Sequence, residues 1–164
     1  MLSLFAALAL AAPTPGPSLQ PRAAAPIEIP APASLDREAV IAWTQAYVQG
    51  EMWTLLAYDR EGVKLTAPGG VRRTPDGLAE ADVRTELFRP IRVSAGVARS
   101  GLARWAVDCM AGRLAVTRMT IFTGNNLQGE IATRVTDERT WQEPVGSEAE
   151  AIQAVCKAVS AGAP

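Results

Sequence analysis

The stretch from Leu102 to Val135 constrains the fold most, because its first strand alternates apolar and polar residues and tight turns divide the stretch. Its first strand pattern places one set of residues on an inward parity: Ala103, Trp105, Val107 and Cys109. The turn sequences Met110-Ala111-Gly112 and Gly124-Asn125-Asn126 separate this strand from two more, Arg113–Thr123 and Gln128–Val135. Consecutive strands joined by short turns predict an antiparallel meander.

Shorter strand patterns come before the meander. Pro68-Gly69-Gly70 and Thr74-Pro75-Asp76-Gly77 are turn sequences that divide this region, and Gly96 and Gly101 are further breaks. The predicted strands are Trp53–Tyr58, Val63–Thr66, Val71–Arg73 and Asp82–Val93.

Helix patterns lie at both ends of the strand region. Ser34 can cap a helix over Ser34–Gln49 that ends at Gly50, and its apolar positions recur at three- and four-residue steps. Near the C-terminus, Ser147 and Glu150 match a capping box ahead of a second helix. One face of this helix carries Ile152, Val155, Cys156 and Val159. We therefore predict an α+β fold, an antiparallel meander sheet packed by a C-terminal helix, with an additional N-terminal helix.

The N-terminus has the features of a secretion signal. Leu2–Ala12 is an uninterrupted apolar run, and at about eleven residues it is shorter than the roughly 20 needed to span a bilayer. Ala9-Leu10-Ala11 supplies a cleavage signal, so we predict a signal peptide over residues 1–11. The Pro- and Ala-rich residues 12–33 predict a disordered linker, followed by a single domain over 34–160. The protein is thus expected in the periplasm, at the cell surface or outside the cell, with no transmembrane segment.

The chain has two cysteines, Cys109 on the predicted strand and Cys156 on the predicted C-terminal helix. In an oxidising compartment two such cysteines usually pair, and we expect a structural disulfide between them. Two buried free thiols and a redox-active pair are the alternatives. The spacing is not the C-x-x-C of redox pairs.

Composition excludes several function classes. The chain has no histidine, which removes the Ser-His, Cys-His and His-metal sites of many hydrolases and zinc enzymes. Its net charge of -1 provides no overall field to attract nucleic acid. We expect a non-catalytic protein without cofactor or metal, because capping and solvation account for the acidic residues at Asp137, Glu138, Glu148 and Glu150.

Four arginines on neighbouring predicted strands form the candidate binding surface: Arg104, Arg113, Arg118 and Arg134. Those that share an outward parity would form a basic stripe. Asp108 could pair with Arg104 or with Arg113 across the hairpin. The tryptophans Trp43, Trp53, Trp105 and Trp141 are expected as core anchors, and any one that is exposed becomes a candidate contact residue.

Several short motifs, in order, resemble the bacterial surface-adhesin protein E family. They are Trp53-Thr54-Leu55-Leu56, Val107-Asp108-Cys109 with Arg113, then Trp141, Pro144 and a helix with Val155-Cys156. The resemblance covers Trp53 to Lys157. It implies an antiparallel sheet packed by a C-terminal helix, a bond between the strand and helix cysteines, and a role like that of adhesins that bind host matrix and serum proteins.

Three functions remain open at this point. The first is an exported binding or adhesion domain whose protein or envelope partner the sequence does not identify. The second is a small ligand-binding or enzymatic domain of the cystatin-like or NTF2-like kind, with a pocket between the first helix and the sheet lined by Trp43, Tyr47 or Tyr58. The third is a structural envelope protein, because apolar residues on both parities of Arg113–Thr123 allow a homodimer interface.

Overall fold

The computed structural model describes residues 28–50 and 52–161. The predicted signal peptide and the linker residues up to 27 lie outside this part of the chain. The elements are α1 (Arg37–Tyr47), β1 (Thr54–Tyr58), β2 (Gly62–Thr66), β3 (Val71–Arg73), β4 (Ala79–Val93), β5 (Gly96–Asp108), β6 (Arg113–Phe122), β7 (Glu130–Val135) and α2 (Ser147–Ala161).

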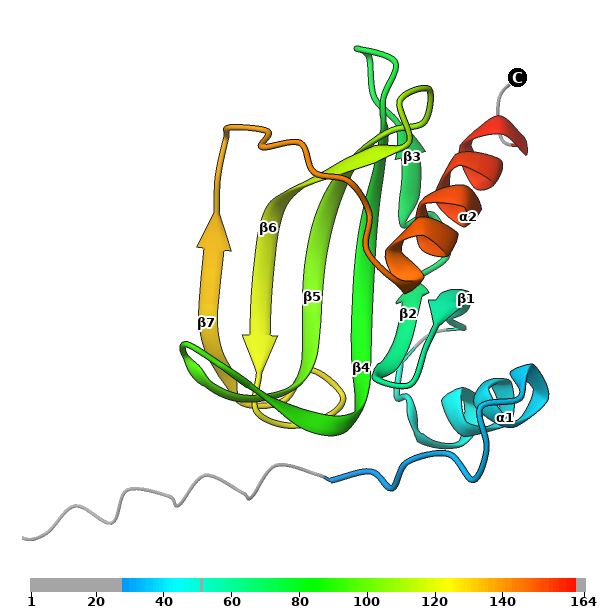
Figure 1. Cartoon of the computed structure of the whole chain (residues 1–164), viewed down its shortest axis with the longest axis vertical. Helices are drawn as coiled ribbons and strands as arrows, with labels where there is room; N and C mark the ends of the chain where they lie inside the picture. The colour runs from blue at the N-terminus through cyan, green and yellow to red at the C-terminus, as the bar shows by residue number, and fades with distance from the viewer. Residues whose placement is uncertain (1–27, 51, 162–164) are drawn as a thin grey trace, which may run out of the picture.

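The strands form one antiparallel seven-stranded sheet in the order β1-β2-β4-β5-β6-β7, with β3 also paired to β4 (Figure 1). The predicted meander is confirmed over β4 to β7, where each strand pairs with the next. Strands β2 and β3 share the other edge of β4, β2 along Arg84–Leu87 and β3 along Ala79–Ala81. The α+β prediction is confirmed.

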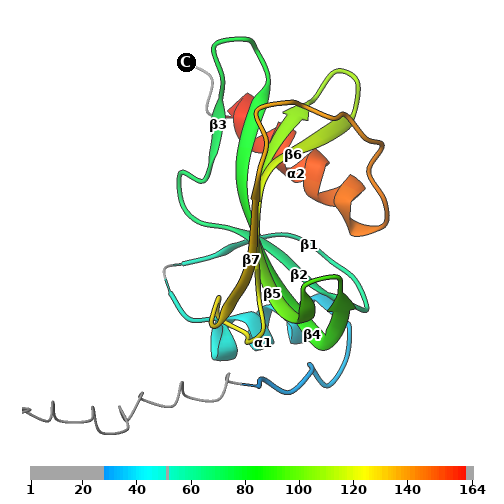
Figure 2. The ribbon, with the colours of Figure 1, turned by 90° about the vertical axis from the view of Figure 1, so that its left-hand side faces the viewer.

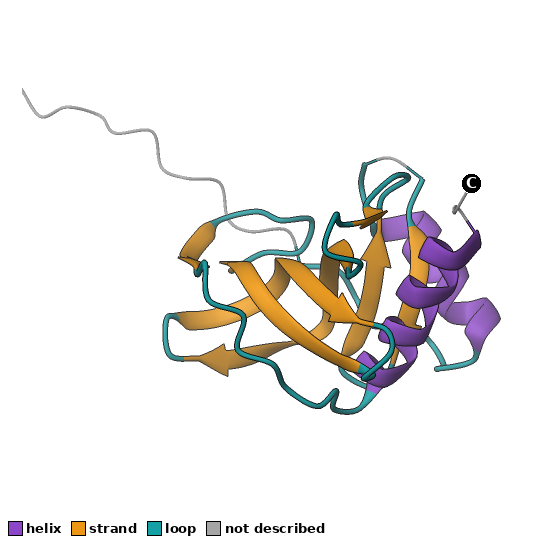
Figure 3. Ribbon diagram, turned by 90° about the horizontal axis from the view of Figure 1, so that it is seen from above, coloured by secondary structure: helices purple, strands orange, loops and turns teal. Residues whose placement is uncertain are grey.

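Each face of the sheet carries one helix. On the first, which we call the α2 face, Ala151, Ile152 and Val155 of α2 pack against Trp105 and Leu114. The opposite α1 face holds a second cluster that includes Val40 and Trp43 of α1 and Val63, Leu65 and Phe88. Both helices lie at the β1–β3 side of the sheet, which leaves β6 and β7 without a covering helix in the described part of the chain (Figures 1 and 3). Seen from the β7 edge, α1 lies below α2 (Figure 2).

Some element boundaries differ from the sequence predictions. Gly101, expected to interrupt the chain, lies inside β5 and pairs with Thr85 and Ile121. Helix α1 ends at Tyr47 instead of Gln49. The reason is a tertiary contact, because the Asn126 side chain accepts from the Gln49 amide at 2.7 Å and donates to the Tyr47 carbonyl at 3.0 Å. These bonds occupy backbone groups that a longer helix would use internally.

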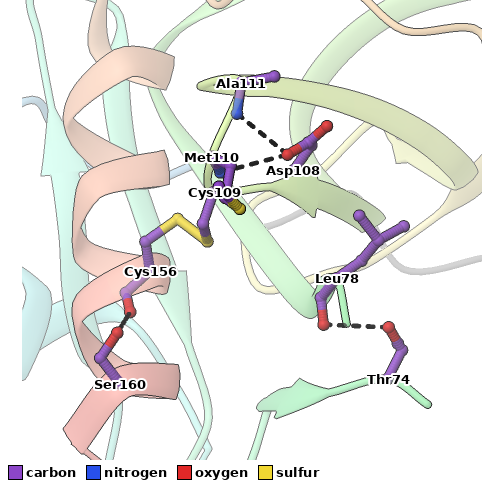
Figure 4. Close-up of a disulfide and its surroundings, with 8 residues drawn as sticks. All are labelled: Thr74, Leu78, Asp108, Cys109, Met110, Ala111, Cys156 and Ser160. Atoms are coloured by element: carbon purple, nitrogen blue, oxygen red, sulfur yellow. Dashed lines mark hydrogen bonds between the residues drawn. A yellow bond between two sulfur atoms is a disulfide. The ribbon is translucent and has the colours of Figure 1, made fainter. Parts of the chain in front are cut away.

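Cys109 and Cys156 form the expected disulfide, with a sequence separation of 47 and a Cα–Cα distance of 5.7 Å (Figure 4). Cys109 is not on the inward face of a strand as predicted. It is the exposed first residue of the turn after β5. The Asp108 carboxylate fixes this turn by accepting from the Met110 and Ala111 amides (Figure 4).

The capping box predicted at Ser147 and Glu150 does not form. The Ser147 hydroxyl instead donates to Asp59 Oδ2 at 2.6 Å and accepts from Lys64 Nζ at 3.0 Å. Just before the helix, the Val145 amide donates to the Glu148 carboxylate at 2.9 Å. A residue that satisfied the local motif is thus used to join α2 to the β1–β2 hairpin.

Asp59 makes this join pH-dependent. Burial by itself would raise the pKa of the Asp59 carboxyl, but the hydrogen bond from Ser147 outweighs it together with two backbone amides and the Lys64 charge. The pKa is therefore held below its ordinary value of 3.8. A carboxyl of this kind stabilises the fold above its unfolded-state pKa, and the contribution is lost as pH falls through the folded-state pKa.

We expect Asp59→Asn to be less stable than wild type at about pH 7, and the difference to shrink as pH falls below roughly 3.8. Urea unfolding at about pH 7 and about pH 3 measures this difference. Asp137→Asn, which removes the same charge from an exposed loop, is the control. A difference that stays constant over this pH range would contradict the assignment.

Candidate functional site

The uncovered part of the α1 face contains two adjoining depressions. The first, the sheet depression, has a volume of about 310 Å³ and is lined by Trp53, Ala67, Asp82, Leu102, Ala103, Arg104, Arg118 and Thr120. The second, the helix depression, has a volume of about 320 Å³ and is lined by Thr44, Gln45, Val48, Gly50, Met52 and Trp53. Trp53 is the residue that both share.

Trp53 is fixed in place by two contacts. Its indole N–H donates to the Gln49 carbonyl at 3.2 Å. The Arg84 guanidinium lies over its ring, 4.7 Å from the centroid, in cation–π geometry. The aromatic surface between the two depressions is therefore preorganised, with little side-chain freedom left to lose on binding.

A buried polar network supports this arrangement. Arg84 and Glu86 are 3% and 0% exposed and pair through Arg84 Nε and Nη2, at 2.8 and 2.5 Å from Glu86 Oε1. The Glu86 carboxylate also accepts from the Asn126 amide and the Asn125 side chain at 3.0 Å each. Arg84 Nη1 donates to the Gln49 carbonyl at 2.8 Å. The network joins β4, the end of α1 and the β6–β7 loop directly behind Trp53.

The four predicted arginines do not act together. Arg104 and Arg118 are direct cross-strand partners on β5 and β6, and both line the sheet depression. Arg113 lies on the same face near the β5–β6 turn, where it pairs with Asp108 at 3.3 Å and stacks on the Trp141 ring at 4.9 Å. Arg134 lies opposite Met119 in the β6–β7 register. Because Met119 is next to Arg118 along β6, its side chain points to the other face, and Arg134 therefore belongs to the α2 face.

Arg104 is neutralised within an ion cluster. It donates to both Asp82 oxygens, at 2.8 and 3.1 Å, and this hydrogen-bonded pairing raises the Arg104 pKa. Glu80 and Arg72 complete the cluster, with Arg72 paired to both carboxylates. The cluster contains two positive and two negative charges and is neutral as a unit.

A polar cleft of about 680 Å³ lies between the β1–β2 turn and the start of α2, and its lining includes Asp59, Lys64 and Ser147. A serine–lysine pair could suggest nucleophilic catalysis, which needs a base to take the serine proton. Here the Ser147 proton is directed to Asp59 and the Lys64 ammonium donates to Ser147. These two bonds join α2 to the β1–β2 hairpin.

Side chains of the second core cluster pack between α1 and the sheet. Trp43, predicted for a pocket there, is 4% exposed, packs edge-on to Phe88 at 5.0 Å and donates to the Pro30 carbonyl at 2.6 Å. Tyr58 packs against the same cluster and Tyr47 is exposed. None of these three residues lines the sheet depression or the helix depression.

An apolar groove of about 170 Å³ lies on the α2 face, and its lining includes Leu87, Ile91, Ala98, Met119 and Ile121. Met119 and Ile121 come from the segment whose apolar residues on both parities allow a homodimer interface, and that interface stays a prediction.

Two contact candidates differ from the arginines singled out in the sequence. Trp53 was expected as a core anchor but is only half-buried, and Met52 beside it is 85% exposed. The signal available was weak, because apolar residues fall on both parities of Trp53–Tyr58 and leave the outward face undecided. Trp43 and Trp105 are buried as predicted.

Residues 28–50 and 52–161 contain no group of three or more Cys, Asp or Glu side chains placed to hold a metal ion. None of their helices has the length and apolar character needed to cross a membrane.

Comparison with known proteins gives one match. No curated protein and no solved structure matches the chain. The profile of the family described as surface-adhesin protein E matches residues 49–157, about two-thirds of the chain. The matched region contains strands β1 to β7, both cysteines and Trp53, the residue that lines both depressions. Helix α1 precedes it. The chain therefore belongs to the surface-adhesin protein E family.

Proposed function

We propose that this protein is an exported, non-catalytic binding domain of adhesin type that holds a protein partner on the two depressions of the α1 face. One observation carries the proposal. Trp53 lines both depressions, so that the two depressions adjoin and form one surface. Membership of the adhesin family and the disulfide, which forms in oxidising compartments, support export and binding.

The composition of this surface is that of a protein interface. Trp, Met and Arg are enriched at the centres of interfaces, and Trp53, Met52 and Arg118 occur together here. Leu102 adds an apolar side chain that is 37% exposed on a central strand. A rigid aromatic anchor between two shallow depressions suits the binding of side chains from a partner.

We expect the exported chain to bind saturably to immobilised basement-membrane extract, and Met52→Glu to weaken this binding by roughly ten-fold or more. A charge at this exposed position would be desolvated by the partner without disturbing the folded core. Surface plasmon resonance with a concentration series of each purified variant measures the effect.

Met110→Glu is the matched control, because Met110 is fully exposed at the β5–β6 turn, away from both depressions. It introduces the same charge in place of the same residue and should bind like wild type. Equal losses in the two variants, or an absence of saturable binding by wild type, would overturn the proposal.

A further inference from the structure

The two arginines of the sheet depression differ in their charge balance. Arg104 and Arg118 are directly opposite on β5 and β6, and like charges in this position repel. Arg104 is neutralised by Asp82, whereas Arg118 is exposed and pairs with no carboxylate of residues 28–50 or 52–161. The depression therefore carries one uncompensated positive charge on its rim.

We infer that Arg118 is the subsite for one carboxylate of the protein partner, an acidic side chain next to an apolar one. This inference rests on the proposed function and specifies the chemistry of its ligand. A carboxylate would compensate the Arg118 charge, and the planar guanidinium can hold it through two parallel hydrogen bonds. Trp53 and Leu102 in the same depression would contact the apolar neighbour.

The charges of the depression favour an acidic protein segment over a polyanion such as a sulfated glycan. A polyanion gains affinity from many cations along its length. Here Asp82 lines the same depression as Arg118 and would repel further negative groups. A volume of about 310 Å³ suits one or two side chains. A single positive charge next to apolar side chains complements a peptide segment in which one acidic residue stands beside an apolar one.

The test uses the full exported chain, ¹⁵N-labelled, and two probes, N-acetyl-leucyl-glutamate amide and N-acetyl-leucyl-glutamine amide. NMR titration follows the Trp53 indole N–H and the Arg118 Nε–H signals. We expect the glutamate peptide to bind at least about five-fold more tightly than its neutral counterpart, because hydrogen bonds to a charged group are the stronger kind. A heparin-derived disaccharide is titrated in parallel.

Three variants locate the effect. Arg118→Ala should bind both peptides equally. Arg118→Lys should keep part of the preference for the glutamate peptide, because it retains the positive charge but loses the planar guanidinium that makes two parallel hydrogen bonds. Arg134→Ala, the same change on the opposite face, should behave like wild type. Removing the repulsion with Arg104 should leave the melting temperature of Arg118→Ala equal to or above that of wild type, which separates loss of binding from loss of fold.

Equal binding of the two peptides by wild type, or a preference that survives in Arg118→Ala, would overturn the inference. Tighter binding of the sulfated disaccharide at Arg118 would also overturn it and assign the subsite to glycans. Failure here differs from failure of the proposed function. If Met52→Glu still abolishes matrix binding while Arg118→Ala does not weaken it, the surface is correct and the carboxylate assignment is wrong.

Discussion

Replacing both cysteines, in a Cys109→Ser/Cys156→Ser variant, is expected to lower the free energy of unfolding by about 4 kcal/mol. The bond closes a loop of 47 residues, and removing it restores the conformational freedom of that loop in the unfolded chain. For a domain of this size, the loss corresponds to a melting temperature lower by roughly 10–20 °C. Circular dichroism melts of both proteins measure the difference.

Reduction provides a control on the same molecule. Wild type melted with an excess of reductant should approach the melting temperature of the double variant, which itself should not respond to reductant. The fold should persist at low temperature, because the packing of Ala151, Ile152 and Val155 against the sheet does not depend on the bond. Equal melting temperatures for wild type and the double variant would contradict a stabilising role for the disulfide.

Arg84→Met is expected to destabilise the protein by about 3–5 kcal/mol, because it leaves the Glu86 carboxylate buried without its cation. Glu86 is 0% exposed, and the two asparagine contacts that remain to it carry no charge. The substitution also removes the cation above the Trp53 ring and the donor to the Gln49 carbonyl. Denaturant unfolding followed by Trp fluorescence measures the loss.

Arg104→Met is the matched control, since it makes the same change in an ion pair whose arginine is 40% exposed. Exposed pairs of this kind contribute about 1 kcal/mol or less. The two variants should therefore differ by several-fold in their effect on the free energy of unfolding. A loss of similar size in both would show that burial of the Arg84–Glu86 pair has no special importance.

Local sequence predicted the elements of the fold well and their roles less well. Alternation along β5, together with the short turns before and after β6, correctly predicted the meander, because a strand that buries one face must alternate. Gly101 was misread, because a glycine inside a strand and a glycine at a break look alike in sequence. The capping box at Ser147 failed because Asp59 and Lys64, far away along the chain, bind its hydroxyl.

The candidate site was only partly predictable. Arg104 and Arg118 were predicted because they lie on neighbouring strands, and cross-strand pairing places them together. Arg134 has the opposite parity once the register of β7 is fixed, and no local pattern determines that register. The supporting asparagines were recognised as turn residues only, since their partner Glu86 lies about 40 residues earlier in the chain.

The sequence by itself determined the α+β class and the meander, because periodicity acts over a few neighbouring positions, and it predicted the pairing of the two cysteines. Only the tertiary structure decided that Arg104 is neutralised by Asp82 and that Trp53 is half-buried between two depressions. Charge balance and exposure depend on partners tens of residues away, which meet only when the sheet is assembled.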